Sequence, residues 1–157
     1  MQTIHVNVET PYDVLVGSGL LSQSGKLIHE SDTRIQKLFV VSDSNVAPLY
    51  LEKLRAVLQS AGFEVFSFVF AAGEQNKNLE TVGQILGQLA QNAFTRTDAI
   101  VALGGGVTTD IAGFAASIFL RGIKVFQIPT SLLAQVDASV GGKTGVDLCS
   151  SVKRLKT

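Results

Sequence analysis

The chain has 157 residues, a length that suffices for one domain with its own core. Because 46% of the residues are hydrophobic and only 17% are charged, the composition excludes a disordered chain. The formal net charge is zero, which argues against a nucleic-acid-binding protein. The single cysteine, Cys149, excludes an internal disulfide, and neither a signal-like N-terminus nor an apolar run of membrane length occurs. We therefore expect a cytoplasmic protein that binds neither nucleic acid nor membranes.

Strand-like and helix-like patterns alternate along the chain. Alternating apolar residues predict an antiparallel strand pair at residues 2–9 and 12–16. Apolar runs then predict strands at 37–42, 63–70, 98–103 and 124–128. Helical spacing predicts helices that end near residue 29, and others at 46–60, 79–93, 107–121 and 130–138. This alternation predicts an α/β fold, a Rossmann-like parallel sheet with flanking helices, preceded by an antiparallel strand pair.

The most informative stretch is the point where strand 98–103 runs into Gly104, Gly105 and Gly106 and a helix follows. Glycine permits φ > 0 and lets a ligand approach the backbone closely. The free N–H groups and the dipole of a helix N-terminus attract anions. We therefore predict a phosphate site at Gly105 and Gly106, with Asp110 in the first turn of the helix.

Two common nucleotide-binding signatures do not fit this chain. A GxGxxG fingerprint that starts at Gly104 would need a small residue where Thr109 stands. A Walker A loop that ends at 142–144 would need glycine where Asp137 stands. The sequence therefore indicates neither an ordinary Rossmann dehydrogenase nor a P-loop ATPase or GTPase.

Further polar residues follow the ends of other predicted strands, where open α/β sheets bind ligands. Asp43 can accept hydrogen bonds from a ribose, or can cap a turn. Glu74 and Lys77 can hold a ribose or an adenine edge, or can belong to a solvated turn. Thr130 and Ser131 can bind a phosphate or amide, and Thr130 can also cap a helix.

Four charged residues have two interpretations each. Asp137 and Lys143 flank a glycine-rich loop and can bind a hydroxylated, anionic substrate, or can form a surface salt bridge. Arg121 can bind a phosphate or interact with the C-terminus of its helix. Asp110 can bind a ribose, a nicotinamide group or a metal, or can simply favour the helix dipole. We expect no metal site within this chain, because no ligand cluster has metal-binding spacing.

Taken together, these segments resemble the 3-dehydroquinate synthases, a family of sugar-phosphate cyclases. This family belongs to the shikimate pathway, which leads to chorismate and the aromatic amino acids. The resembling segments are 42–46, 72–77, 104–114, 120–122 and, as the most specific, 128–145. The resemblance implies an NAD-binding α/β domain at 1–148, followed by a tail at 149–157 that does not match and is disordered or truncated.

The resemblance also implies which residues bind each part of the cofactor and substrate. Asp43, Glu74 and Lys77 are implied to bind the adenosine part of NAD. For its pyrophosphate and nicotinamide ribose the implied residues are Gly105, Gly106 and Asp110, and for the nicotinamide Thr130, Ser131 and Leu133. Asp137 and Lys143 are implied where cofactor meets substrate, and Arg121 at the substrate phosphate of a neighbouring subunit in a homodimer.

The enzymes of this family are lyases that convert 3-deoxy-D-arabino-heptulosonate 7-phosphate into 3-dehydroquinate. They use NAD as a catalyst that is regenerated in each cycle, and they eliminate phosphate. Its zinc or cobalt ligands lie in an α-helical second domain without counterpart here, so we expect an inactive N-terminal fragment. Thr109 departs from the usual glycine of the family and is expected to add bulk near the cofactor. The alternatives are another sugar-phosphate cyclase and a non-catalytic NAD-binding or dimerisation module.

Overall fold

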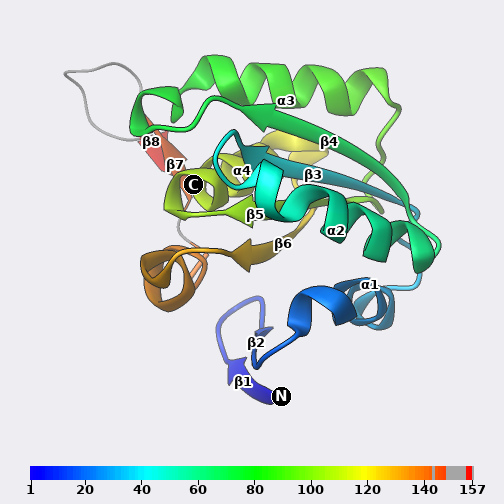
Figure 1. The fold of residues 1–157 in the computed structure, drawn as a ribbon. Helices are drawn as coiled ribbons and strands as arrows, with labels where there is room; N and C mark the ends of the chain where they lie inside the picture. Colours follow the sequence, from blue (N-terminus) through cyan, green and yellow to red (C-terminus); the bar gives the residue numbers. More distant parts are fainter. Residues whose placement is uncertain (143, 148–154, 157) are drawn as a thin grey trace.

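The fold is built around a sheet of four parallel strands in the order β4-β3-β5-β6 (Figure 1). The computed structural model describes residues 1–142, 144–147 and 155–156. The strands of the sheet are β3 (Lys37–Asp43), β4 (Glu64–Phe70), β5 (Ala99–Gly104) and β6 (Lys124–Pro129). The predicted Rossmann-like parallel sheet is therefore confirmed.

Helices cover both faces of this sheet. Those on one face are α1 (Leu20–Ser31) and α2 (Ala47–Ser60), and those on the other are α3 (Leu79–Gln91) and α4 (Gly106–Ile118). Along β3, Leu38 and Val40 enter the core beneath α1 and α2, whereas Phe39 and Val41 enter the core beneath α3 and α4. A strand that is buried on both faces reads as a continuous apolar run, which is why the sequence located it.

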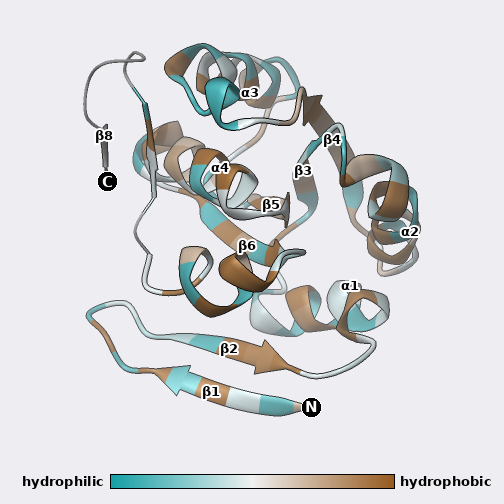
Figure 2. Cartoon of the chain, turned by 60° about the vertical axis from the view of Figure 1, so that its left-hand side comes forward, coloured by the Kyte–Doolittle hydropathy of each residue, from teal (hydrophilic) through white to brown (hydrophobic). Residues whose placement is uncertain are grey.

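The remaining elements are short. They are β1 (Gln2–Val6), β2 (Tyr12–Val16), the 3-10 turns η1 (Glu74–Asn76) and η2 (Phe119–Arg121), the π-helical turn η3 (Ala134–Ala138), β7 (Gly145–Val146) and β8 (Leu155–Lys156). The antiparallel pair β1–β2 lies to one side of the main sheet (Figure 2). No helix in the described part of the chain combines the length and the apolarity needed to cross a bilayer.

Some element boundaries differ from the sequence-based expectation. The first strand ends at Val6 rather than at residue 9, and the segment 130–138 contains a π-helical turn rather than a regular helix. Helix α4 ends at Ile118, because Leu120 and Arg121 take left-handed φ values of 50° and 69°, which an α-helix cannot contain. Ile118, the last residue of α4, is 43% exposed.

A buried carboxylate secures the amino ends of β3 and β5. Asp98 is 3% exposed, and its two oxygens accept hydrogen bonds from the Lys37 N–H at 3.0 Å and from the N–H and hydroxyl of Thr95 at 2.8 and 2.9 Å. Removing this side chain would leave two backbone N–H groups without these partners.

A second carboxylate ties the start of β6 to the segment after α1. Asp32 accepts hydrogen bonds from Arg34 at 2.9 Å and Lys124 at 2.7 Å. The hydrogen bonds from Arg34 and then Lys124 hold the pKa of Asp32 well below its ordinary value.

Candidate functional site

The carboxyl ends of β3 and β5 meet at the point where the order of strands reverses. From β3 the chain crosses to β4 on one side, and from β5 it crosses to β6 on the other. A crevice between two such strands is where open α/β sheets bind their ligands. Asp43 ends β3 and Gly104 ends β5, so both predicted positions lie at this switch point.

The three residues Gly104–Gly106, here called the glycine corner, form the turn from β5 into α4. Glycine permits φ > 0, but the corner does not use this freedom: Gly105 has a φ of −82°, and neither of its neighbours lies in the left-handed region. The corner needs glycine for space instead. A Cβ on Gly104 would lie 2.6 Å from the Cβ of Thr108, closer than packed atoms approach.

The segment after β6 lies against the other two glycines. A Cβ on Gly105 would come 3.4 Å from Ser131 Oγ, and one on Gly106 would come 3.4 Å from Ala138 Cβ. The Thr130 N–H donates to the Gly104 carbonyl at 2.9 Å. Gly105 and Gly106 are half-buried, so the corner is not sealed from solvent. A side chain would fill this cradle, and its absence is what a closely approaching phosphate requires.

Asp43 connects the carboxyl end of β3 to α4. Its Oδ2 accepts a hydrogen bond from Thr108 Oγ1 at 3.1 Å, and its Oδ1 accepts from the N–H groups of Asn45 and Val46 at 2.9 and 3.1 Å. The turn-capping interpretation is therefore confirmed. The ribose interpretation remains compatible with it, since a carboxylate offers about four acceptor sites and three are used here.

Lys77 and Asp110 form an ion pair between η1 and α4. The Lys77 side chain is 4% exposed and that of Asp110 is 19% exposed, while Glu74, at 58%, lies 3.8 Å from the ammonium. Lys77 is thus not in a solvated turn, as one alternative had it. Asp110 stands in the second turn of α4 rather than the first, because the helix begins at Gly106.

The segment after β6 exposes large apolar side chains beside the glycine corner. Leu132, Leu133 and Val136 are 75%, 66% and 67% exposed, and Asp137 is exposed as well. Lys143, predicted to act with Asp137, lies outside the described residues.

Arg121 is not brought to this site. It follows α4, whose 13 residues start at the glycine corner and extend about 20 Å away from it, toward the amino ends of the strands. Its side chain is exposed and its backbone is left-handed. Within one chain it therefore cannot act beside Gly105 and Asp110.

Thr109, expected to add bulk near the cofactor, is fully buried. Its hydroxyl donates to the Gly106 carbonyl at 3.0 Å, so the side chain faces the protein interior. Its neighbour Thr108, also fully buried, was not singled out in the sequence although it joins α4 to Asp43. Its place in the first turn after three glycines was the only available signal.

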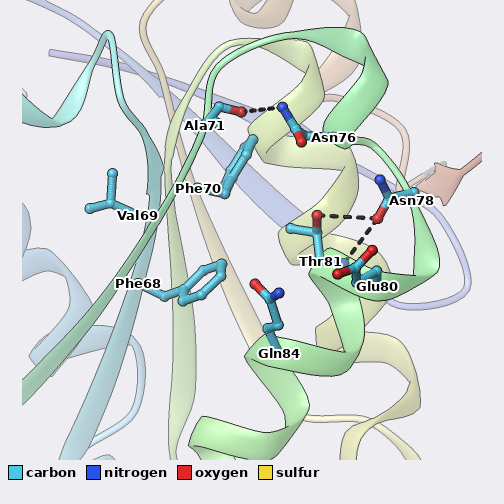
Figure 3. A pocket seen from close by; sticks show the side chains of 9 residues that line it. All are labelled: Phe68, Val69, Phe70, Ala71, Asn76, Asn78, Glu80, Thr81 and Gln84. Atoms are coloured by element: carbon cyan, nitrogen blue, oxygen red, sulfur yellow. Dashed lines mark hydrogen bonds between the residues drawn. The ribbon is translucent and has the colours of Figure 1, made fainter.

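A pocket of about 280 Å³ lies between β4 and the first turns of α3 (Figure 3). The phenyl rings of Phe68 and Phe70 lie on the strand side and Gln84 on the helix side. None of the predicted site residues lines it, and β4 is two strands away from β5. The pocket is therefore separate from the glycine corner.

No metal centre emerges from the described residues, among which no group of three or more His, Cys, Asp or Glu side chains could hold an ion. The described part of the chain thus does not fit a metal cofactor. The described residues form an α/β domain. Its strand switch point carries the glycine corner, the Thr108–Asp43 hydrogen bond and the Lys77–Asp110 ion pair. This is the architecture of a nucleotide-binding domain.

Comparisons with known proteins agree with this class. The family model of the 3-dehydroquinate synthase N-terminal domain matches residues 67–155. The 3-dehydroquinate synthase of Streptococcus sanguinis is 52% identical over 137 residues, which are 87% of this chain and 38% of that protein. The synthase of Streptococcus suis is 51% identical over 138 residues, which are 88% of this chain and 39% of that protein.

Among the solved structures with the same fold are two synthases of cyclic sugar products. A 2-deoxy-scyllo-inosose synthase, complexed with carbaglucose-6-phosphate, NAD⁺ and Co²⁺, has a TM-score of 0.87 at 27% identity and covers 98% of this chain and 41% of its own. The 2-epi-5-epi-valiolone synthase of Streptomyces hygroscopicus, with NAD⁺ and Zn²⁺ bound, has a TM-score of 0.80 at 33% identity, covering 98% and 42%.

The chain belongs to the 3-dehydroquinate synthase family. It spans somewhat under two fifths of the length of the curated relatives it matches. The predicted domain boundary at residue 148 stays a prediction, because residues 148–154 and 157 lie outside the described part.

Proposed function

We propose that this chain is the NAD-binding part of a 3-dehydroquinate synthase. The observation that carries the proposal is the switch point, where one helix, α4, joins the glycine corner, Thr108 bonded to Asp43, and Asp110 paired with Lys77. About half of the residues are identical to those of curated 3-dehydroquinate synthases. The two sugar cyclases of known structure described above are 27% and 33% identical, which favours dehydroquinate over their products.

In this proposal the bare backbone of Gly105 and Gly106 and the N-terminus of α4 hold the pyrophosphate of NAD. Asp43 and Glu74 accept hydrogen bonds from the adenosine part, while Lys77 donates to it. Asp110 holds the nicotinamide ribose. The segment after β6, with Thr130, Ser131 and Leu133, lines the nicotinamide.

NAD, when bound, supplies a transient oxidation of a substrate hydroxyl that is reversed before product leaves, so the net reaction is a cyclisation with loss of phosphate from 3-deoxy-D-arabino-heptulosonate 7-phosphate. Asp137 and Lys143 are proposed to bind the hydroxylated substrate beside the cofactor. No described cluster of this chain fits the zinc or cobalt that we expect in the family, so those ligands are proposed to come from the part that the relatives have in addition.

A homodimer is part of the proposal because of Arg121. Its place at the opposite end of α4 means that only a second copy could bring this side chain to the substrate phosphate. Sedimentation velocity on the protein checks this: a dimer is expected, and a monomer at all concentrations would leave Arg121 without this role.

Isothermal titration with NAD tests the cofactor assignment directly. The chain is expected to bind NAD and to release no phosphate from the sugar phosphate by itself. Substituting Gly105→Val would fill the cradle beside Ser131 and abolish binding. Gly87→Ala is the matched control, since a Cβ there meets no atom within 4 Å. If millimolar NAD produces no heat of binding, the assignment of NAD as the cofactor is wrong.

Two alternatives give other outcomes. Binding of NAD without turnover, even after the chain is joined to the remainder of a relative, would identify a non-catalytic NAD-binding or dimerisation module. Turnover of a different sugar phosphate by that joined protein would identify another sugar-phosphate cyclase.

A further inference from the structure

Helix α4 contains a glycine in its interior that no expectation used. Gly113 lies within the continuous helix Gly106–Ile118, where glycine is less favourable than alanine. Its φ is helical, so no backbone conformation demands glycine. The reason is space: a Cβ on Gly113 would overlap Thr144 Cγ2 and lie 3.1 Å from Thr144 Cβ. Thr144 is 8% exposed, so its side chain is seated in a notch of the helix.

The residues after Thr144 are held by three further contacts. Val146 is fully buried in the core beneath α3 and α4. The Asp147 N–H donates to the Lys77 carbonyl at 2.8 Å, and Asp147 forms an isolated parallel bridge with Asn78. Segment 144–147 therefore lies against both α4 and the residues that follow η1.

These contacts form a closed ring of interactions that includes the Lys77–Asp110 pair. Lys77, whose carbonyl accepts from Asp147, pairs through its ammonium with Asp110. Asp110 and Gly113 are three residues apart on α4 and therefore lie on the same side of the helix. The ring runs from Gly113 to Thr144, along the segment to Asp147, on to Lys77, and back to α4 at Asp110.

We propose that Thr144, seated in the notch at Gly113, is a positioning residue for the NAD site. It fixes segment 144–147 against α4, and that segment fixes the backbone of Lys77 and with it the Lys77–Asp110 pair. The part of this inference that concerns NAD binding rests on the proposed function. Thr144 itself is not assigned any contact with the cofactor.

A size exchange tests this. Gly113→Ala places a methyl group where Thr144 Cγ2 lies, and Thr144→Ser removes that Cγ2 while keeping the hydroxyl. We expect Gly113→Ala to weaken NAD binding about tenfold, as overpacking predicts, and the double variant to return to within about threefold of the unsubstituted chain. Gly87→Ala, a helical glycine with open space, is expected to change nothing.

Amide hydrogen exchange gives a second readout that does not depend on NAD. Gly113→Ala is expected to lower protection at residues 145–147, including the Asp147 N–H, while α1 and α2 keep theirs; the double variant restores it. Thr144→Ala empties the notch without overpacking it and is expected to weaken binding and protection several-fold. It provides the test if Gly113→Ala fails to fold.

The inference is overturned if Gly113→Ala binds NAD and protects these amides as the unsubstituted chain does, or if the double variant is as impaired as Gly113→Ala alone. Unchanged behaviour of Thr144→Ala would overturn it too. If the unsubstituted chain does not bind NAD, the proposed function fails, while the exchange pattern still shows whether the notch holds the segment.

Discussion

The Lys77–Asp110 pair allows the sharpest test of how the site is held together. The Lys77 side chain is 4% exposed, and beyond Asp110 the nearby carboxylate is Glu74, 3.8 Å away and largely in solvent. Replacing Asp110 by Asn leaves the ammonium buried without its main partner. Breaking such a pair from one side costs about 3 kcal/mol. With a urea m-value of about 2 kcal/mol/M, the unfolding midpoint should fall by about 1.5 M.

The same reasoning fixes the outcome for the other variants of a double-mutant cycle. Lys77→Met leaves the Asp110 carboxylate without its ammonium partner and should lower the free energy of unfolding by a similar amount. Lys77→Met combined with Asp110→Asn removes both charges and should cost no more than either change alone, a coupling of about 2–3 kcal/mol. The exposed pair Lys26–Glu30, at 3.7 Å, is the control and should show a coupling of about 0.5 kcal/mol or less.

Urea unfolding followed by circular dichroism measures the cycle, and NAD titration of the same variants separates folding from binding. The doubly substituted chain should fold and yet bind NAD at least about tenfold more weakly, since both side chains are proposed ligand contacts. Single variants that each lose under about 1 kcal/mol and whose effects add would refute the reasoning, because the pair would then be energetically like a surface pair.

Three further predictions concern stability away from the pair. Asp98→Ala should cost about 2–5 kcal/mol in urea unfolding because it strands two backbone N–H groups, whereas Asp13→Ala on the exposed strand pair should cost under about 0.5 kcal/mol. The depressed pKa of Asp32 contributes stability above about pH 4, the unfolded pKa, which is lost as pH falls toward the folded value; Asp32→Asn should flatten this acid limb, and an unchanged limb would contradict it. Arg121→Gly should raise stability by about 1 kcal/mol by relieving a φ of 69°, whereas Arg55→Gly inside α2 should lower it by a similar amount, both read from thermal midpoints.

Local chemistry made much of the fold predictable. The strands buried on both faces read as continuous apolar runs, and the helices show their spacing, so each main element was located to within a few residues. The glycine corner was recognisable because three adjacent glycines between a strand and a helix have few other uses. Only the structure shows that Gly104 is required for space beside Thr108 and that no glycine of the corner uses a positive φ.

What the sequence by itself determined is the set of elements, the class of fold and the residues at the ends of strands. Only the tertiary structure decided which of those residues meet. Thr108 bonds Asp43 across 65 residues, Lys77 pairs with Asp110 across 33, and Thr144 fills the notch at Gly113, whereas Arg121 stands apart at the far end of α4. These contacts follow from the strand order β4-β3-β5-β6. That order arises from packing between distant segments, and the local periodicity of the sequence does not encode it.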